Sequence, residues 1–320
     1  MKKLISFLAL AMVLGCGNTN SGNTGGTGGA AGTRGAGGEG GAGGQVFSAT
    51  PPTFIGGERR AEVQFPGNYD PTVEHPLLVV LHGFGPFDGV IQAAFLGLDK
   101  MVDAKDLVML LPKGTENEDG NRFWNGTSFC CDPDNAIDDV GYLSGLIEEA
   151  KQTYNIDEKR VYLLGHSNGG FMSFRMACEA SEIITAIVSL AGSTFADADD
   201  CQPATQPVSV LAVHGTADTT ILYDGVPDGY PSAVDTVESF ASAAGCDTGA
   251  STSLGNINLV GAVEGDETEQ VAYTSGCQGG VDAALWTIQD GVHIPGFYPP
   301  GSDEPAFADL TTDWLLQHTR

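Results

Sequence analysis

The amino-acid sequence predicts an α/β fold in which helices cover both faces of a mostly parallel sheet. Short apolar runs recur along the chain, helical patterns separate them, and hydrophobic residues make up 42% of the 320 residues. Continuous apolar runs are expected for strands buried on both faces, and their alternation with helices implies crossover connections between parallel strands. The segment 46–320 fits one large domain of this kind.

The predicted strands begin with an edge strand and continue with buried strands. Residues 61–65 alternate between apolar and polar types, which is typical of an edge strand. Later runs are apolar almost throughout and predict buried strands at residues 76–81, 107–111, 160–164, 184–190, 208–213 and 283–288.

Helical patterns occupy the segments between these strands. In residues 135–154, apolar side chains recur at helical spacing from Ile137 to Ala150, and Asp138 and Asp139 suit the first turn of a helix. Further helices are predicted at residues 168–180, 233–243 and 305–318.

The charge of the chain excludes one class of partner. It has 14 Lys and Arg against 41 Asp and Glu, a formal net charge of -27. Such a surface repels phosphate backbones and anionic headgroups, so we expect no nucleic-acid partner. The acidic residues are interpreted as a solvated surface. As a separate prediction, we expect the protein to be a monomer.

The N-terminal segment is predicted to direct export and to tether the protein. Lys2 and Lys3 precede an apolar run at residues 4–14, which is shorter than the about 20 residues that span a membrane. Residues 1–15 therefore read as an export signal, and the Cys16 that follows Gly15 resembles the lipid-attachment site of bacterial lipoproteins. We expect residues 16–45, rich in Gly, Thr and Asn, to be a lipid-anchored linker at the outer membrane or cell surface. The alternative is ordinary secretion.

Six further cysteines indicate disulfides, because an exported chain meets an oxidising environment. They are Cys130, Cys131, Cys178, Cys201, Cys246 and Cys277. Six cysteines permit about 15 pairings. Local spacing favours Cys178–Cys201 and Cys246–Cys277, which leaves Cys130–Cys131. A zinc site is the rival interpretation, and it is disfavoured because no CxxC pair is present.

A candidate nucleophile follows the predicted strand at residues 160–164. The sequence Gly165-His166-Ser167-Asn168-Gly169 is a G-x-S-x-G pattern between a strand and a helix. A turn this tight requires flanking residues without side chains, and it presents the serine hydroxyl at the carboxyl edge of the sheet. The alternative is a purely structural role, in which the serine caps the helix.

A base and an acid follow Ser167 in the order that α/β-hydrolases use. His293 lies in a turn-rich loop after the strand at 283–288, and Asp218 follows the strand at 208–213. The carboxylate would hold the imidazole in orientation, and the imidazole would take the serine proton. Backbone N–H groups of Asn168 and of Phe84, in the His82-Gly83-Phe84-Gly85 turn, are the expected donors to the oxyanion.

Seven segments in this order resemble the poly(3-hydroxybutyrate) depolymerase and feruloyl esterase group of α/β-hydrolases, which is related to carbohydrate esterase family 1. The segments are LVVLHGFG, RFWNG, CC, DDVGYL, VYLLGHSNGGFMSFRMAC, HGTADTT and GVHIPG. The resemblance implies an α/β-hydrolase fold with nucleophile Ser167, acid Asp218 and base His293. It also implies that Trp124 lies near the cleft and binds substrate, although core packing is an equal alternative.

One departure from the group concerns the substrate. Relatives commonly carry a tryptophan soon after the catalytic histidine, whereas Ile294 and Pro295 follow His293 here. The triad is unaffected, but the substrate-contacting surface differs.

The resulting hypothesis is an exported serine carboxylic-ester hydrolase that needs no metal or organic cofactor. Its expected substrate is a polymer that carries feruloyl or acetyl esters, such as a plant polysaccharide, or a hydroxyalkanoate polyester. A peptidase of the prolyl-oligopeptidase type and a non-catalytic surface-binding lipoprotein are the alternatives.

Overall fold

The computed structural model describes residues 45–131, 136–201 and 206–320. The segment Gln45–Arg320 is one compact unit. The predicted export signal, Cys16 and the linker up to residue 44 lie outside the described residues.

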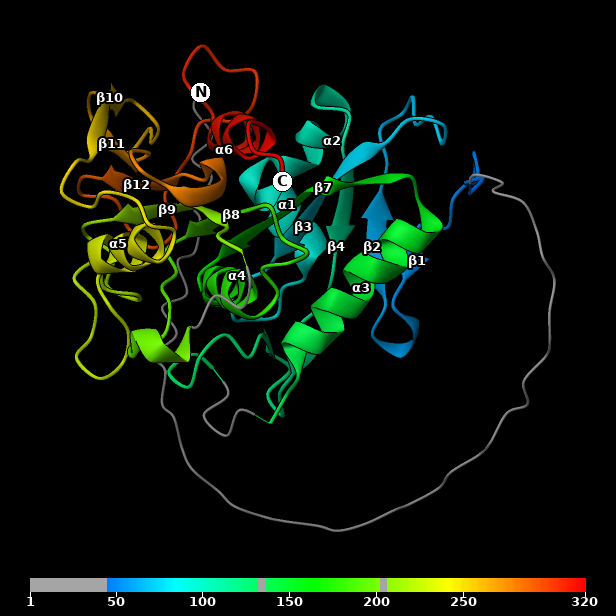
Figure 1. Cartoon of the computed structure of the whole chain (residues 1–320), viewed down its shortest axis with the longest axis horizontal. Helices are drawn as coiled ribbons and strands as arrows, with labels where there is room; N and C mark the ends of the chain where they lie inside the picture. The colour runs from blue at the N-terminus through cyan, green and yellow to red at the C-terminus, as the bar shows by residue number, and fades with distance from the viewer. Residues whose placement is uncertain (1–44, 132–135, 202–205) are drawn as a thin grey trace, which may run out of the picture. The chain divides into compact units, whose positions relative to one another are not determined.

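A ten-stranded sheet runs through the described residues (Figure 1). The strand order is β1-β2-β4-β3-β7-β8-β9-β12-β11-β10. The central strands from β4 to β12 are mutually parallel, whereas the pairs at both edges are antiparallel. The strands are Phe54–Ile55 (β1), Ala61–Gln64 (β2), His75–Leu81 (β3), Val108–Leu111 (β4), Ile156–His166 (β7), Ala186–Leu190 (β8), Ser209–Gly215 (β9), Thr252–Ile257 (β10), Thr268–Tyr273 (β11) and Ala283–Ile288 (β12). A separate small hairpin pairs Thr115–Glu116 (β5) with Arg122–Phe123 (β6).

Helices cover both faces of the sheet. The strands of the parallel part therefore have buried side chains on both sides. The helices are Gly89–Leu96 (α1), Met101–Ala104 (α2), Asp139–Thr153 (α3), Asn168–Glu179 (α4), Ala233–Ala243 (α5) and Phe307–Leu316 (α6). One core lies between the sheet and α3, α4 and α5, and a second core lies between the sheet and α1, α2 and α6 (Figure 1). None of the described helices combines the length and the apolar character that crossing a membrane requires.

The predicted strands and helices are present, with shifted boundaries and several additions. The strand β7 begins at Ile156, four residues before the predicted start, and α3 begins at Asp139. The elements β1, β5, β6, α1, α2, β10 and β11 were not predicted. In β10, five of the six residues are exposed, so this edge strand has no apolar pattern that could reveal it.

Three disulfides join the cysteines in the pairs that local spacing favoured. They are Cys130–Cys131, Cys178–Cys201 and Cys246–Cys277.

Removal of the Cys246–Cys277 bridge by the double substitution Cys246→Ala/Cys277→Ala should lower the free energy of unfolding. The bridge closes a loop with a sequence separation of 31. A loop of this size restricts the unfolded chain by about 3–4 kcal/mol, and urea denaturation of both proteins measures the difference. A difference below about 1 kcal/mol would mean that the bridge does little for stability.

Candidate active site

The turn between β7 and α4 holds Ser167 in a strained backbone conformation. Its φ of 56° and ψ of -120° lie in a region that L-residues rarely adopt. A side chain at Gly165 would collide with the backbone of Gly169, and one at Gly169 would collide with the carbonyl of Leu81. The two glycines of the G-x-S-x-G pattern are therefore required by close backbone approach, as the sequence predicted.

The structure brings the side chains of Ser167, Asp218 and His293 together. The Nδ1 atom of His293 lies 2.7 Å from Asp218 Oδ2, and its Nε2 atom lies 3.0 Å from Ser167 Oγ. An ionised carboxylate can only accept hydrogen bonds, so Nδ1 carries the proton and Nε2 accepts from the serine hydroxyl. The three residues follow β7, β9 and β12, which are parallel strands whose carboxyl ends meet at one edge of the sheet.

Hydrogen bonds keep the buried carboxylate of Asp218 ionised. Burial alone would raise its pKa, but hydrogen bonds from His214, from His293 and from the Thr220 amide outweigh burial and hold the pKa well below its usual range. Its Oδ1 atom accepts from the amides of Thr220 at 2.8 Å and Ile221 at 3.0 Å. The side chain is therefore fixed in orientation, with Oδ2 turned to His293.

The turn after β3 lies directly against Ser167. A side chain at Gly83 would contact His166 and the Cβ atom of Ser167, so a glycine allows the close approach. Among the described residues, the backbone amides of Phe84 and Asn168 donate to no acceptor. Two amides without an acceptor are what the prediction of oxyanion donors requires, and their role stays a prediction.

Three further buried histidines each hold the backbone of a loop at the site. His166 Nε2 lies 3.1 Å from the carbonyl oxygen of His293, and His214 Nε2 lies 2.8 Å from that of Ile221. His82 Nδ1 donates to the Gly83 carbonyl at 2.7 Å, while its Nε2 accepts from the Gly114 amide. Sequence reasoning did not assign these roles, although each histidine directly follows or ends an apolar strand run at the edge where the site lies.

Burial keeps two of these histidines neutral. Burial lowers the pKa of His82 to about 4, and burial together with the nearby His293 lowers the pKa of His166 to about 4. In the unfolded chain both imidazoles would take up a proton near the ordinary histidine pKa of 6.5.

Acid should therefore destabilise the protein before its carboxylates titrate. Between pH 6.5 and about 4 the unfolded state binds more protons than the folded state, so the free energy of unfolding falls as the pH falls, by a few kcal/mol in total. Urea denaturation at a series of pH values measures this slope. The variant His166→Gln keeps an N–H donor without the titration and should show a shallower slope; an identical slope would remove His166 from the explanation.

The structure corrects the prediction that Trp124 contacts substrate. Its side chain is fully buried, and its indole Nε1 donates to the carbonyl of His82 at 3.0 Å. The ring therefore lies beneath the turn after β3 and presents no surface to a ligand. The core-packing alternative describes its position better.

Exposed apolar side chains stand on the loops that carry the site. Val292 and Ile294 flank His293, Phe87 follows the turn of Phe84, and Leu222 follows Asp218. Each of these side chains is more than 40% exposed. They give the loops around Ser167 an apolar character.

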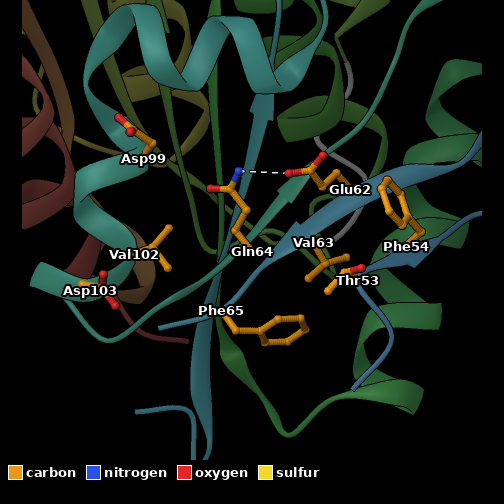
Figure 2. A pocket seen from close by; sticks show the side chains of 9 residues that line it. All are labelled: Thr53, Phe54, Glu62, Val63, Gln64, Phe65, Asp99, Val102 and Asp103. Atoms are coloured by element: carbon orange, nitrogen blue, oxygen red, sulfur yellow. Dashed lines mark hydrogen bonds between the residues drawn. The ribbon is translucent and has the colours of Figure 1, made fainter. Parts of the chain in front are cut away.

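A hollow lies elsewhere, beside β2 (Figure 2). The segment predicted as an edge strand is thus the second strand of the sheet, because β1 pairs with its outer side. The volume of the hollow is about 650 Å³, and its lining includes Glu62, Gln64, Asp99 and Asp103. Glu62 accepts a hydrogen bond from Gln64 there. The lining of the hollow contains none of the predicted site residues. Within the described part of the chain, no group of three or more His, Cys, Asp or Glu is arranged to hold a metal ion.

Comparisons with known proteins place the chain near esterases. No family model matches it. It is 26% identical over 267 residues to Feruloyl esterase D of Neurospora crassa, covering 80% of this chain and 81% of that protein. It is 31% identical over 173 residues to the bifunctional acetylxylan esterase/xylanase XynS20E of Neocallimastix patriciarum, covering 53% of this chain and 23% of that protein. Feruloyl esterase B of Piromyces equi is 27% identical over 251 residues, covering 74% and 43%. The chain thus spans less than two thirds of the latter two proteins.

Solved structures agree on the fold. An acetyl xylan esterase from Aspergillus awamori superimposes with a TM-score of 0.58 at 14% identity, over 80% of this chain and 93% of that one. A thermostable esterase gives a TM-score of 0.51 at 15% identity, over 83% and 62%. The sheet, its covering helices and these neighbours define an α/β-hydrolase fold. Within that fold, the chain is a homologue of proteins named feruloyl esterase and acetylxylan esterase, so the feruloyl esterase part of the resemblance seen in its motifs is confirmed. None of the relatives described here is named a polyester depolymerase.

Proposed function

We propose that the protein is a serine carboxylic-ester hydrolase with Ser167 as nucleophile, His293 as base and Asp218 as the acid that orients it. One observation carries the proposal: a continuous hydrogen-bonded chain from Ser167 Oγ through His293 to Asp218 Oδ2, with distances of 3.0 and 2.7 Å. The esterase names of the homologues support the same reaction class.

The arrangement supports a two-stage hydrolysis. His293 Nε2 takes the hydroxyl proton while Ser167 Oγ attacks the ester carbonyl. The tetrahedral oxyanion accepts hydrogen bonds from the amides of Phe84 and Asn168. The C–O bond to the alcohol then breaks, and the imidazolium returns its proton to the leaving alkoxide. Water, activated by the same imidazole, attacks the acyl-enzyme and releases the carboxylic acid. Side chains and backbone amides of the protein, together with water, supply every group that these reaction steps require. The proposal therefore includes no cofactor.

The proposed substrate is an ester carried by a polymer. Feruloyl or acetyl esters of a polysaccharide are favoured by the names of the homologues, and a hydroxyalkanoate polyester is the second candidate. The apolar side chains around the site suit either an aromatic acyl group or an apolar polymer. We further propose that an export signal at residues 1–15 and a lipid on Cys16 deliver a monomeric enzyme to the cell envelope, with residues 16–45 as a tether.

A substrate panel tests the proposal. Purified protein is assayed with methyl ferulate, acetylated xylan, hydroxybutyrate polymer and a proline-containing peptide. Hydrolysis of at least one ester but not of the peptide is expected. Cleavage of the peptide without any ester would replace the esterase proposal by a peptidase, and inactivity on all four would support a binding role.

A further inference from the structure

Trp124 and Asn168 are joined by a pair of reciprocal hydrogen bonds. The amide of Trp124 donates to Asn168 Oδ1 at 2.6 Å, and Asn168 Nδ2 donates back to the carbonyl of Trp124 at 2.8 Å. Both residues are fully buried. Because Asn168 is the residue after Ser167, this pair fixes the segment around Trp124 to the first turn of α4.

The indole ring of Trp124 reaches the other side of the site. Its Nε1 donates to the carbonyl of His82 at 3.0 Å, and the centroids of the two rings are 5.0 Å apart. His82 in turn donates from Nδ1 to the carbonyl of Gly83. The peptide between Gly83 and Phe84 is planar, so a fixed carbonyl also fixes the direction of the Phe84 N–H.

The ion pair between Arg59 and Asp139 holds the segment next to Trp124. The next residue, Asn125, donates its amide to Asp139 Oδ2 at 2.7 Å, and Asp139 Oδ1 lies 2.7 Å from Arg59 Nη1. The guanidinium of Arg59 lies 5.3 Å from the centroid of the Trp124 ring and 3.9 Å from that of Tyr142. These contacts leave the indole little freedom to move relative to the sheet.

We propose that Trp124 is a positioning residue that holds the amides of Phe84 and Asn168 at a fixed separation and direction. This inference rests on the proposed function, in which those two amides bind the oxyanion. Trp124 touches both halves of that site: its main chain binds the Asn168 side chain, and its side chain binds the turn that carries Phe84. A preorganised donor pair stabilises charge only in the tetrahedral state, so its loss should affect the reaction rather than substrate binding.

The substitution Trp124→Phe tests the indole contact, because it keeps an aromatic ring and removes the N–H. We expect kcat/KM for a chromogenic acetate ester to fall by about 10- to 100-fold, since loss of a whole oxyanion donor costs about 100- to 1,000-fold. The inhibition constant of an arylboronic acid, which forms a tetrahedral adduct with a serine, should rise by a similar factor. Trp314→Phe is the matched control: this buried tryptophan of α6 packs on the other core and should leave both values within about twofold.

A purely structural role for Trp124 gives a different result. In that case Trp124→Phe lowers the thermal midpoint, while kcat/KM and the boronate constant stay within about twofold of the wild type at a temperature where the variant is folded. That outcome overturns the inference, as does a loss of kcat/KM with an unchanged boronate constant. If Trp124→Phe does not fold, Asn168→Ala tests the inference by the same two measurements. This variant keeps the backbone N–H of residue 168 and removes the side-chain hydrogen bonds to Trp124.

The inference and the proposed function can fail separately. If Ser167→Ala keeps full activity, the proposed function fails. If Ser167→Ala is inactive and Trp124→Phe retains wild-type kcat/KM and boronate affinity, only the positioning role fails.

Discussion

The substitution Asp218→Asn is expected to lower kcat/KM for a chromogenic ester by about 1,000- to 10,000-fold, on the scale seen for such changes in serine hydrolases. The contacts of Asp218 give a specific reason. Its Oδ1 atom accepts from two backbone amides, those of Thr220 and Ile221, and an amide oxygen would keep that place. The new NH₂ group would therefore face His293 Nδ1. The imidazole must then accept at Nδ1 and carry its proton on Nε2, where it cannot take the proton of Ser167.

Asp290→Asn is the matched control for this prediction. Asp290 is exposed, is three residues from His293 in the sequence and has a φ of 55°, a conformation that asparagine tolerates well. Its variant should keep kcat/KM within about twofold. Comparable losses in both variants would show that the orientation of His293 does not depend on Asp218.

The substitution Ser167→Ala is expected to lower kcat/KM by about 1,000-fold or more while the protein stays folded. The oxygen that attacks the ester is removed, but the backbone strain at residue 167 is shared by serine and alanine, so the turn should persist. Activity is measured with the same ester, and thermal unfolding checks that the midpoint is unchanged within a few degrees. A variant that is folded and retains more than about a tenth of the activity would mean that another group performs the attack.

The sequence was informative where local pattern and topology act together. The apolar runs before Ser167 and Asp218 predicted strands β7 and β9, and parallel strands bring their carboxyl ends to one edge. His293 could be selected because it follows another apolar run, now β12, and lies downstream of the serine. These three placements needed the G-x-S-x-G pattern, the order of serine, acid and base in α/β-hydrolases, and the order and direction of the buried strands.

Contacts between distant residues were not predictable from the same patterns. Whether Trp124 faces the cleft or the core depends on Asn168 and Arg59, which lie 44 and 65 positions away in the sequence. The loop contacts of His166 depend likewise on where the chain returns at His293. The local sequence pattern around an aromatic residue or a histidine next to a strand is the same whether the side chain faces the cleft or is buried in the interior.

The central claim is that the hydroxyl of Ser167, activated by His293, is the nucleophile. Stoichiometric labelling with a fluorophosphonate, followed by mass spectrometry of the digested protein, tests it most directly. We expect one adduct per chain, located on Ser167, with loss of esterase activity in proportion to labelling and no adduct in the Ser167→Ala variant. An adduct on a different residue, or complete inactivation while Ser167 remains unlabelled, would contradict the account.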